Sequence, residues 1–260
     1  MKNNNIYPPL YLRLYSVWFR HMRVYTTNLL SNAFPPFLEP ILFLMAIGLG
    51  LGKYITAMNG IPYIQFLASG LIVTSSMFTA SFECTFGTFI RLEFDHVYDG
   101  MLGAPLSARD IIAGEIIWCA TKGMFFSLAV LGVFLALGVI PPGISLLVPL
   151  AGLLTGGLFS ALSLLVTSFV KNINHFNFYF TGFLTPLFYF TGAVFPLENF
   201  PPILRIITNF IPLTGSIRIS RALCFGHFSP VIIFDVFYMI LLVFLLGEAS
   251  IRLLSRRMID

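Results

Sequence analysis

The chain carries six long apolar runs, and these constrain its fold more than any other feature of the sequence. Each run is close to the ~20 residues that an α-helix needs to cross the hydrocarbon core of a bilayer. The runs cover approximately residues 29–52, 61–84, 107–138, 144–170, 176–195 and 229–251. We therefore predict an all-α integral membrane protein with six transmembrane helices, in which residues 1–260 form a single transmembrane domain.

The composition agrees with a membrane protein and argues against a soluble one. Charged residues make up 10% of the chain, hydrophobic residues make up 57%, and the mean hydropathy is +0.89. Since a soluble domain carries about 25% charged residues, this chain has too few charges to cover a water-facing surface. The formal net charge of +4 does not indicate nucleic-acid binding, because the Lys and Arg residues lie at the ends of the apolar runs.

Residues 8–25 differ from the apolar runs because their hydrophobic side chains occupy only one face of a helix. Arginine recurs on the opposite face, at Arg13, Arg20 and Arg23, and Trp18 lies beside it. A basic face next to an aromatic side chain is typical of a helix that lies in the headgroup plane. We predict an amphipathic interface helix here, with an ordinary cytosolic helix as the alternative.

The basic residues indicate how the spans are oriented. The side that holds both chain ends carries Lys2, Arg13, Arg20, Arg23, Arg91, Arg109, Lys171, Arg252, Arg256 and Arg257, whereas the opposite side carries only Lys53, Arg205, Arg218 and Arg221. Because cytoplasmic loops are enriched in Lys and Arg, we predict a multi-pass protein with both termini in the cytoplasm. An even number of spans gives the same answer.

The connection between the second and third runs, residues 85–106, is too long and too charged to be a simple turn. It contains Arg91, Glu93, Asp95, His96 and Asp99 before Pro105. Ser107 and Asp110 follow with the S-x-x-D spacing of a capping box, so we predict that a helix begins there.

The second long connection, residues 196–228, remains apolar although it is predicted to face outward. A loop exposed to water would not have this composition. We predict two short helices that dip back into the outer leaflet and are broken near Ile211 and Pro212. Such re-entrant backbone is tolerated only where it packs against other protein.

The sequence contains no arrangement of residues typical of catalysis or metal binding. Its four histidines are far apart, and none belongs to an HExxH pattern. Residues 48–53 resemble a phosphate-binding loop only in their glycines and lysine, because Ile47 replaces the first glycine and Tyr54 replaces the final Ser or Thr. The three cysteines are widely spaced, which favours small apolar side chains over a redox site. We predict no catalytic residue, no metal site and no cofactor in this chain.

Several ionisable residues fall within or at the edges of the predicted spans, namely Glu39, Glu83, Lys122, Asp235 and Glu248. Such residues are costly in a bilayer, so each is a functional candidate. Glu83 lies near the inner end of the second run and Lys122 about four turns into the third helix, so their depths are similar. An ion pair between them is one hypothesis; the alternative, which such residues adopt more often, is that each reaches water separately.

The fifth run combines aromatic and hydroxyl side chains. Packing against lipid and neighbouring helices is the usual role of such aromatics, and it is the interpretation that we favour. The alternative is that this surface lines a conduit for sugar rings and acyl chains, through Tyr179, Phe183, Thr185, Tyr189 and Thr191.

Three segments carry a resemblance to a known family of membrane proteins. They are ASGLIVTSSMFTASFECTFGTFIR at 68–91, IIAGEIIWCATKG at 111–123 and LTPLFYFTGAVFPLENFP at 184–201. With the order of the predicted elements, they resemble the membrane subunit of ABC transporters of the type-2 exporter class. The chain looks most similar to the nodulation-factor, or lipo-oligosaccharide, export permeases, and the resemblance covers nearly its whole length.

The resemblance implies partners, a location and a cargo. Two copies of the chain would pair around a conduit and dock two separate ABC ATPase subunits, which would hold ATP and Mg²⁺. The location implied is the bacterial inner membrane. The cargo would be a lipid-linked or lipid-modified glycan moved outward, and hydrophobic drugs are the alternative cargo within this class.

The resemblance also assigns roles to the two long connections. Residues 85–106 would form a coupling helix that contacts the ATPase, through Arg91, Glu93, Asp95, Asp99, Leu102 and Pro105. Asp99 and Gly100 depart from the Glu or Ala that is common in the family, so the contact with a particular ATPase would differ. Residues 196–228 would form an outer gate that includes Pro196, Pro201, Pro202, Pro212 and Gly215.

Two other classes of function remain as alternatives. A secondary transporter without an ATPase is expected to contain inverted repeats with matched broken helices in each half, whereas here only the fifth run is followed by re-entrant structure. A membrane enzyme acting on lipids or peptides is expected to contain the ligand or nucleophile clusters that this sequence lacks.

Overall fold

A computed structural model describes residues 7–52, 54–55, 57–58 and 60–259 of this chain. Its described part is a helical bundle with one short ribbon, in which β1 (Ala57–Met58) pairs antiparallel with β2 (Ile61–Pro62). Two residues that enter the orientation prediction, Lys2 and Lys53, lie outside the described residues.

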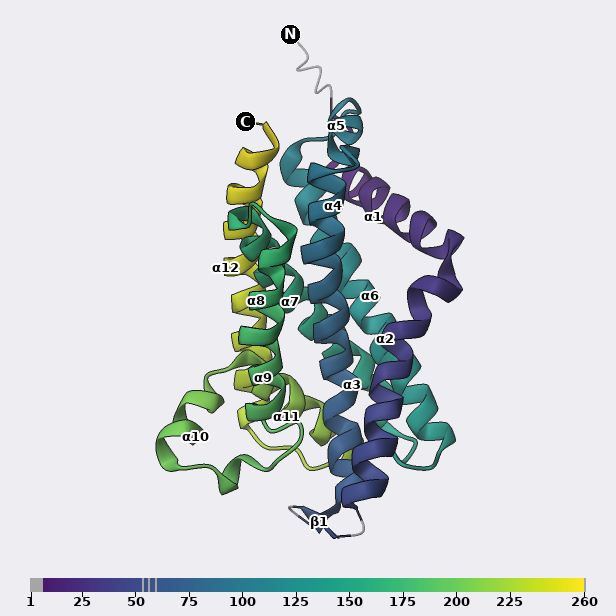
Figure 1. Ribbon diagram of the computed structural model, residues 1–260, viewed down its shortest axis with the longest axis vertical. Coiled ribbons are helices and arrows are strands. Elements are labelled where there is room, and N and C mark those ends of the chain that lie inside the picture. Colours follow the sequence, from purple (N-terminus) through teal and green to yellow (C-terminus); the bar gives the residue numbers. More distant parts are fainter. Residues whose placement is uncertain (1–6, 53, 56, 59, 260) are drawn as a thin grey trace.

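Most of the described chain is helical (Figure 1). The helical elements are α1 (Leu10–Thr27), α2 (Leu29–Phe43), η1 (Leu44–Leu49), α3 (Tyr63–Phe82), η2 (Glu83–Gly87), α4 (Thr88–Glu93), α5 (Val97–Leu102), α6 (Ala108–Ala136), η3 (Ile144–Leu147), α7 (Val148–Phe169), η4 (Ile173–His175), α8 (Phe176–Tyr179), η5 (Phe180–Leu184), α9 (Thr185–Phe190), η6 (Leu197–Asn199), α10 (Pro202–Asn209), α11 (Pro212–Phe225) and α12 (Val231–Ile259). Of the short elements, η1, η2 and η5 are π-helical turns, and η3, η4 and η6 are 3₁₀ turns.

Five helical stretches are long and apolar enough to cross a membrane. Within the described residues they are Leu29–Leu49, Tyr63–Glu93, Ala108–Ala136, Ile144–Phe169 and Val231–Met258. The remaining predicted span, residues 176–195, is helical only over 176–190, which is shorter than the ~20 residues that a perpendicular crossing needs. The prediction of a helical, multi-span membrane protein is confirmed, and the count of six spans stays a prediction.

The helix α3 lies in the middle of the bundle, where every residue from Phe66 to Met77 is buried. Small residues allow α3, α6 and α7 to approach closely: the Ser76 hydroxyl donates to the Gly152 carbonyl oxygen at 2.6 Å, and a Cβ atom at Gly123 would lie only 2.2 Å from that hydroxyl oxygen. Close approach of backbones is the usual way in which helices gain packing energy in a membrane. The core of this protein is therefore fixed by glycine and serine as much as by large apolar side chains.

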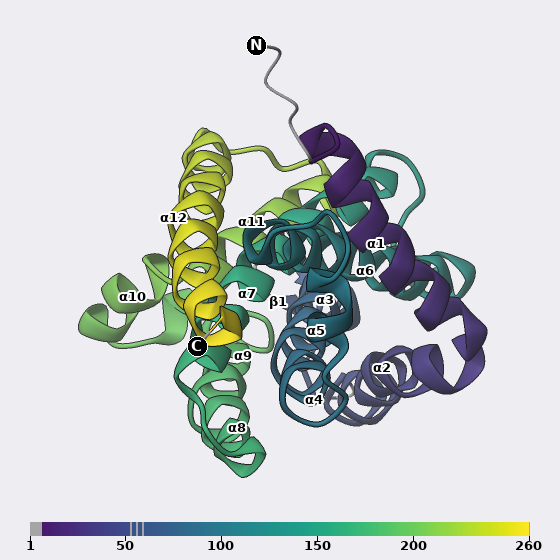
Figure 2. The ribbon, with the colours of Figure 1, turned by 90° about the horizontal axis from the view of Figure 1, so that it is seen from above.

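The helix α1 lies oblique to the bundle, across the end of α6 (Figure 2). Gly114 of α6 makes room for it, because a Cβ atom there would be 2.5 Å from Val17 Cγ1. Arg13 forms an ion pair with Asp110, so part of the predicted basic face is turned toward protein. Ser107 and Asp110 form the predicted capping box at the start of α6, which confirms that prediction.

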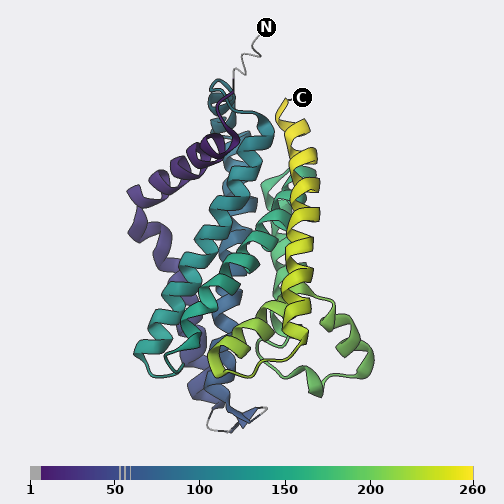
Figure 3. The same cartoon turned by 180° about the vertical axis from the view of Figure 1, so that it is seen from behind.

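The two ends of the bundle differ in structure. The start of α1, the short helix α5 and the end of α12 lie at one end, and the β1–β2 ribbon, α10 and α11 lie at the other (Figures 1 and 3). We call these the α5 end and the ribbon end. Both ends of the described chain are thus on one side, as an even number of crossings requires; that this side is cytoplasmic stays a prediction.

Candidate functional site

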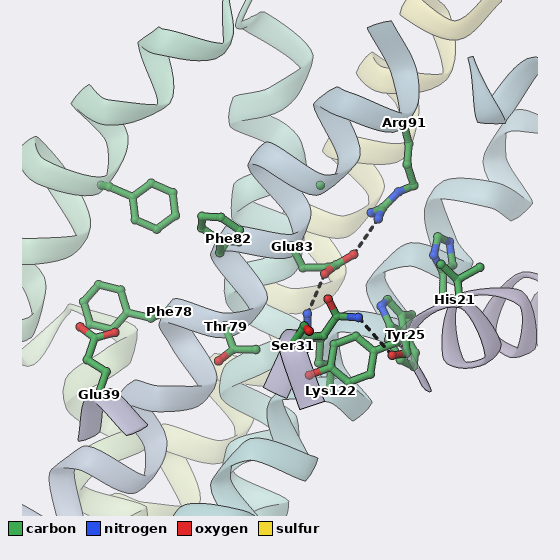
Figure 4. Close-up of a pocket in the computed structure, with 15 residues that line it drawn as sticks. His21, Tyr25, Ser31, Glu39, Phe78, Thr79, Phe82, Glu83, Arg91 and Lys122 are labelled. Atoms are coloured by element: carbon green, nitrogen blue, oxygen red, sulfur yellow. Dashed lines mark hydrogen bonds and ion pairs between the residues drawn. The ribbon is translucent and has the colours of Figure 1, made fainter. Parts of the chain in front are cut away.

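A cavity of about 720 Å³ opens between the α1–α2 arm and the bundle, nearer the α5 end (Figure 4). Its walls come from α1, α2, α3, η2, α4, η5 and α6. This size is within the range of sites for small molecules, and the lining combines aromatic side chains with convergent polar groups, as is common in such sites. The helices α1 and α2 meet in a turn at Asn28, and the cavity lies between this arm and α3.

Glu83 is the central charge of this cavity (Figure 4). Its Oε2 atom lies 2.7 Å from Lys122 Nζ, and its Oε1 atom lies 2.6 Å from Arg91 Nη1. The hypothesis of an ion pair between Glu83 and Lys122 is thus consistent with the structure, which adds Arg91 as a second cation. Glu83 begins the π-helical turn η2, and such turns are frequent at functional sites because they displace a side chain from the regular helical position.

A second carboxylate, Glu115 of α6, extends these contacts away from the cavity. It is 1% exposed and lies 2.9 Å from Arg91 Nη2, so Arg91 bridges two carboxylates. The Tyr98 hydroxyl donates to Glu115, and His21 Nε2 lies 3.1 Å from its Oε1 atom. Because each charge has an opposite partner, the group can remain ionised in a low-dielectric setting.

We call these six residues the polar network: His21, Glu83, Arg91, Tyr98, Glu115 and Lys122. It joins α1, the α3–η2–α4 helix, α5 and α6 at one place. Burial, with the neighbouring Glu115 carboxylate as a further cause, raises the pKa of the Tyr98 phenol well above its usual value, so this group remains a hydrogen-bond donor at neutral pH. The arrangement can transmit a displacement of α5 to the cavity, since Tyr98 is the contact that α5 supplies.

A smaller cavity of about 250 Å³ lies beside the first, between α2, α3 and α9. Glu39, Phe78 and Thr79 line both cavities. The two spaces therefore share a wall, and together they run from the polar network toward the fifth predicted span.

Comparison with known proteins identifies the family. Residues 13–225 match the family model described as "ABC-2 type transporter". The chain belongs to this family. It is 31% identical to Nodulation protein J of Sinorhizobium fredii over 94% of both chains, and 33% identical to Nodulation protein J of Rhizobium leguminosarum bv. trifolii over 82% of this chain and 81% of the relative. It is also 27% identical to the inner membrane transport permease YadH of Escherichia coli over 68% of this chain.

As an ABC-2 type permease, the chain is a transport subunit, and its family implies an ABC ATPase as partner. Within the described ranges, no group of three or more His, Cys, Asp or Glu side chains is placed to hold a metal ion. The cysteines at 84, 119 and 224 are all buried and free.

The six residues predicted to couple the permease to its ATPase do not form one surface. Arg91 is turned into the polar network, and Glu93 lies 2.8 Å from Arg257 Nη2 at the end of α12. Asp95 and Pro105 are exposed, and Leu102 is half-buried. Asp99 is exposed in α5, within ion-pair distance of His96, which adopts a left-handed backbone conformation just before that helix. The exposed surface of this segment is therefore formed by α5 and the turns on either side of it.

The predicted outer gate divides into two helices that meet at Phe210 and Ile211, close to the predicted break. Three of its prolines occupy the starts of these helices: Pro201 and Pro202 at α10, and Pro212 at α11. Pro196 precedes η6, and Gly215 packs against Asp235 of α12, to whose Cβ atom an added Cβ would be 3.2 Å distant. The helix α11 is packed against α3 and α12, whereas α10 projects from the bundle (Figure 1).

The five conduit candidates occupy three different settings. Thr185 and Tyr189 line the smaller cavity. Tyr179 and Thr191 are buried and form hydrogen bonds inside the protein, to Ser163 Oγ at 3.0 Å and to the Leu187 carbonyl oxygen at 2.5 Å. The fifth, Phe183, is 43% exposed and lines neither cavity.

Sequence reasoning did not identify Glu115, Tyr98 or His21 as members of a site. One signal was available: Glu115 interrupts the apolar stretch IIAGEIIW, and a carboxylate in such a place needs a partner. No comparable signal exists for Tyr98 or His21, because their roles depend on how α5 and α1 pack against α6.

Proposed function

We propose that this chain is the membrane subunit of an ATP-driven exporter in the bacterial inner membrane, with both termini cytoplasmic. Two copies would pair, dock two ABC ATPase subunits and move a lipid-linked or lipid-modified glycan outward. The observation that carries this proposal is the polar network. It joins a helix at the expected ATPase-facing end to a cavity large enough for part of an amphiphile.

The coupling step begins at residues 85–106. Closure of the ATPases would push α5, and Tyr98 would carry this displacement to Glu115 and Arg91. Because Arg91 also holds Glu83, the Glu83–Lys122 contact at the cavity would change with it. Residues 196–228 would then separate at the opposite end as the outer gate.

The cargo is proposed from the relatives and from the lining of the two cavities. The relatives that match most of this chain are named Nodulation protein J. Aromatic side chains such as Phe78 and Tyr189 alternate with Thr79 and Thr185 along the cavity walls. This mixture suits an amphiphile with both an acyl chain and hydroxyl groups.

Efflux of hydrophobic drugs by the same ATP-driven route is the second candidate. The observation that favours it is the group of apolar aromatic side chains in the wall of the larger cavity, Phe78, Phe82 and Phe180. Secondary transport without an ATPase is the third candidate. In that case no ATPase would displace α5, and the contact between Tyr98 and the buried Glu115 would have no role in coupling.

Purification of the tagged chain from its native membrane tests the proposal. We expect an ABC ATPase to co-purify, and its ATP hydrolysis to be coupled to outward movement of a lipid-linked glycan in vesicles. Substitution of Asp99 or Leu102 should uncouple hydrolysis from transport while membrane insertion is preserved. Absence of any ATPase from the complex, or transport that survives disruptive changes throughout residues 95–106, would contradict the proposed role.

A further inference from the structure

Among the described residues that line the two cavities, Glu39 is the one carboxylate that the polar network does not use. It lies in the stretch Leu29–Leu49, lines both cavities and is exposed to them (Figure 4). Among the residues that the structure describes, none forms a hydrogen bond or ion pair with it. An acidic side chain at such a depth is costly without a partner, so its presence needs a reason.

Two hydroxyl groups of the larger cavity also lack partners. The Thr79 hydroxyl belongs to a residue that is 4% exposed and lines both cavities, and the Tyr25 hydroxyl oxygen is buried. Neither atom has a hydrogen-bond partner within the described part of the chain. A buried polar atom is usually satisfied, so these two unpaired hydroxyls in the wall of the cavity need an explanation. Both oxygens are covered in this arrangement, and a ligand would reach them only after the side chains turn toward the cavity.

The charged side chains around the cavity indicate which charge the headgroup of that ligand carries. Lys122 and Arg91 already contact Glu83, and Arg91 also contacts Glu115. Of the charged side chains that line the larger cavity, both cations are therefore engaged, and Glu39 is the carboxylate that they do not contact among the described residues. A phosphate or another anion would have to displace Glu83 from Lys122, whereas a hydroxyl or ammonium group can donate directly to Glu39.

The wall of the larger cavity next to Glu39 is aromatic (Figure 4). Phe82 and Phe180 pack edge to face with ring centroids 6.2 Å apart, and Phe78 lines both cavities next to them. Such a wall accepts an alkyl chain or the apolar face of a sugar ring. The aromatic side chains are thus suited to the apolar part of a ligand whose polar part reaches Glu39 beside them.

We propose that these two adjacent cavities form a binding chamber for an amphiphile with an uncharged or basic, hydrogen-bonding headgroup, and that Glu39 between them is its specificity-determining residue. Thr79 and Tyr25 supply further hydrogen bonds. The inference deepens the proposed export function and rests on it for the direction of transport. It specifies which headgroups are accepted.

Binding can be measured without ATP through Trp118, which lines the larger cavity. The chain has two tryptophans, so Trp18→Phe leaves Trp118 as the sole emitter. The full-length protein in phosphatidylcholine nanodiscs is titrated with alkyl amphiphiles of equal length that carry a bromine quencher. Their headgroups are maltoside, glucosamine or phosphate. We expect saturable quenching by the first two probes and at least tenfold weaker binding of the phosphate.

The Glu39→Gln variant then tests the assigned residue. This change should lower the affinity for the glucosamine probe about tenfold or more, because a hydrogen bond between charged groups is lost. The affinity for the maltoside probe should fall about threefold. Glu39→Lys should make the affinity for the phosphate probe higher than that for the two sugar probes. Thr79→Val should lower the affinity for both sugar probes. The control is Glu248→Gln, since Glu248 pairs with Arg109 and Arg252 outside the chamber and its loss should change no affinity.

The proposal fails if quenching does not saturate, if the phosphate probe binds as tightly as the maltoside, or if Glu39→Gln leaves all affinities unchanged. These outcomes differ from failure of the exporter assignment. An ATPase that co-purifies while Glu39→Gln binds normally would overturn the chamber alone. Glu39-dependent binding by a chain that associates with no ATPase would overturn export and leave the chamber in place.

Discussion

The two ends of the molecule use partly buried arginine side chains differently. At the α5 end, Arg91 bridges Glu83 and Glu115, and its network borders a cavity. At the ribbon end, Arg218 contacts Asp235 through two nitrogens, at 2.6 and 2.8 Å. Arg221 donates to the Gly192 carbonyl oxygen at 2.6 Å and lies over the Phe66 ring.

The difference lies in what each arginine joins. Arg91 is one member of a chain of contacts that crosses several elements, so a shift at one member changes the others. Arg218 and Arg221 fasten α11 to its neighbours, and neither lines one of the two cavities described above. We therefore expect substitution of Arg91 to affect coupling, and substitution of Arg218 or Arg221 to affect stability. In the proposed outer gate, the separation would then take place at α10, which projects from the bundle, and not at α11, which these arginines hold.

The largest effect is expected from Arg91→Leu. It leaves Glu83 with only Lys122 and removes a cation from the buried Glu115, and breaking a buried pair in this way costs about 3–5 kcal/mol. The melting midpoint of the purified protein should fall sharply, and transport should be lost. The matched control is Arg252→Ala, whose exposed pair with Glu248 should contribute less than about 1 kcal/mol. Equal loss in both variants would contradict the role given to Arg91.

Arg218→Leu should produce the opposite pattern. It leaves Asp235, which is 2% exposed, without its charged partner, at a cost of about 1–3 kcal/mol. We expect a lower melting midpoint but an unchanged ratio of transported cargo to hydrolysed ATP in the protein that remains folded. A change in that ratio would remove the distinction between the two ends.

Reversal of both charges in the Glu83–Lys122 pair sharpens the comparison further. In an isolated pair, Glu83→Lys with Lys122→Glu would restore what either single change lost. Here Arg91 would then face a lysine at position 83, so we expect restoration to be incomplete. The neutral double variant Glu83→Gln with Lys122→Gln should be the more stable, as measured by melting midpoint. If the charge swap restored the melting midpoint fully, the ion pair between Arg91 and Glu83 would not contribute to stability.

Tyr98→Phe should affect stability by an amount comparable to Arg218→Leu, but it should also have a clear effect on coupling. It removes one hydrogen bond to a carboxylate, which contributes about 1.5–3 kcal/mol. Insertion and ATPase binding should be preserved, while ATP hydrolysis proceeds with less transport. Because the pKa of Tyr98 is raised well above 10.0, coupling in the unaltered protein should not decline between neutral pH and the usual phenol pKa. A decline over that range would indicate that Tyr98 loses its proton early.

The sequence was sufficient for the spans and the helix boundaries that depend on local signals. Apolar length identified five spans, and Ser107 and Asp110 marked the start of α6 because a capping box is made within a single turn. The ion pair could be only a hypothesis, since depth along a helix does not say which way a side chain turns. Glu115 and Tyr98 meet only through the packing of α5 against α6, which no local pattern encodes.

The central claim is that the polar network connects α5 to the cavity, and Trp118 can report it directly. The complex with its ATPase is prepared with Trp18→Phe, and acrylamide quenching of Trp118 is measured with and without a non-hydrolysable ATP analogue. We predict that the nucleotide changes the accessibility of Trp118 and that Tyr98→Phe abolishes this change while nucleotide binding persists. An equal change in the presence and absence of the Tyr98 hydroxyl would contradict the claim.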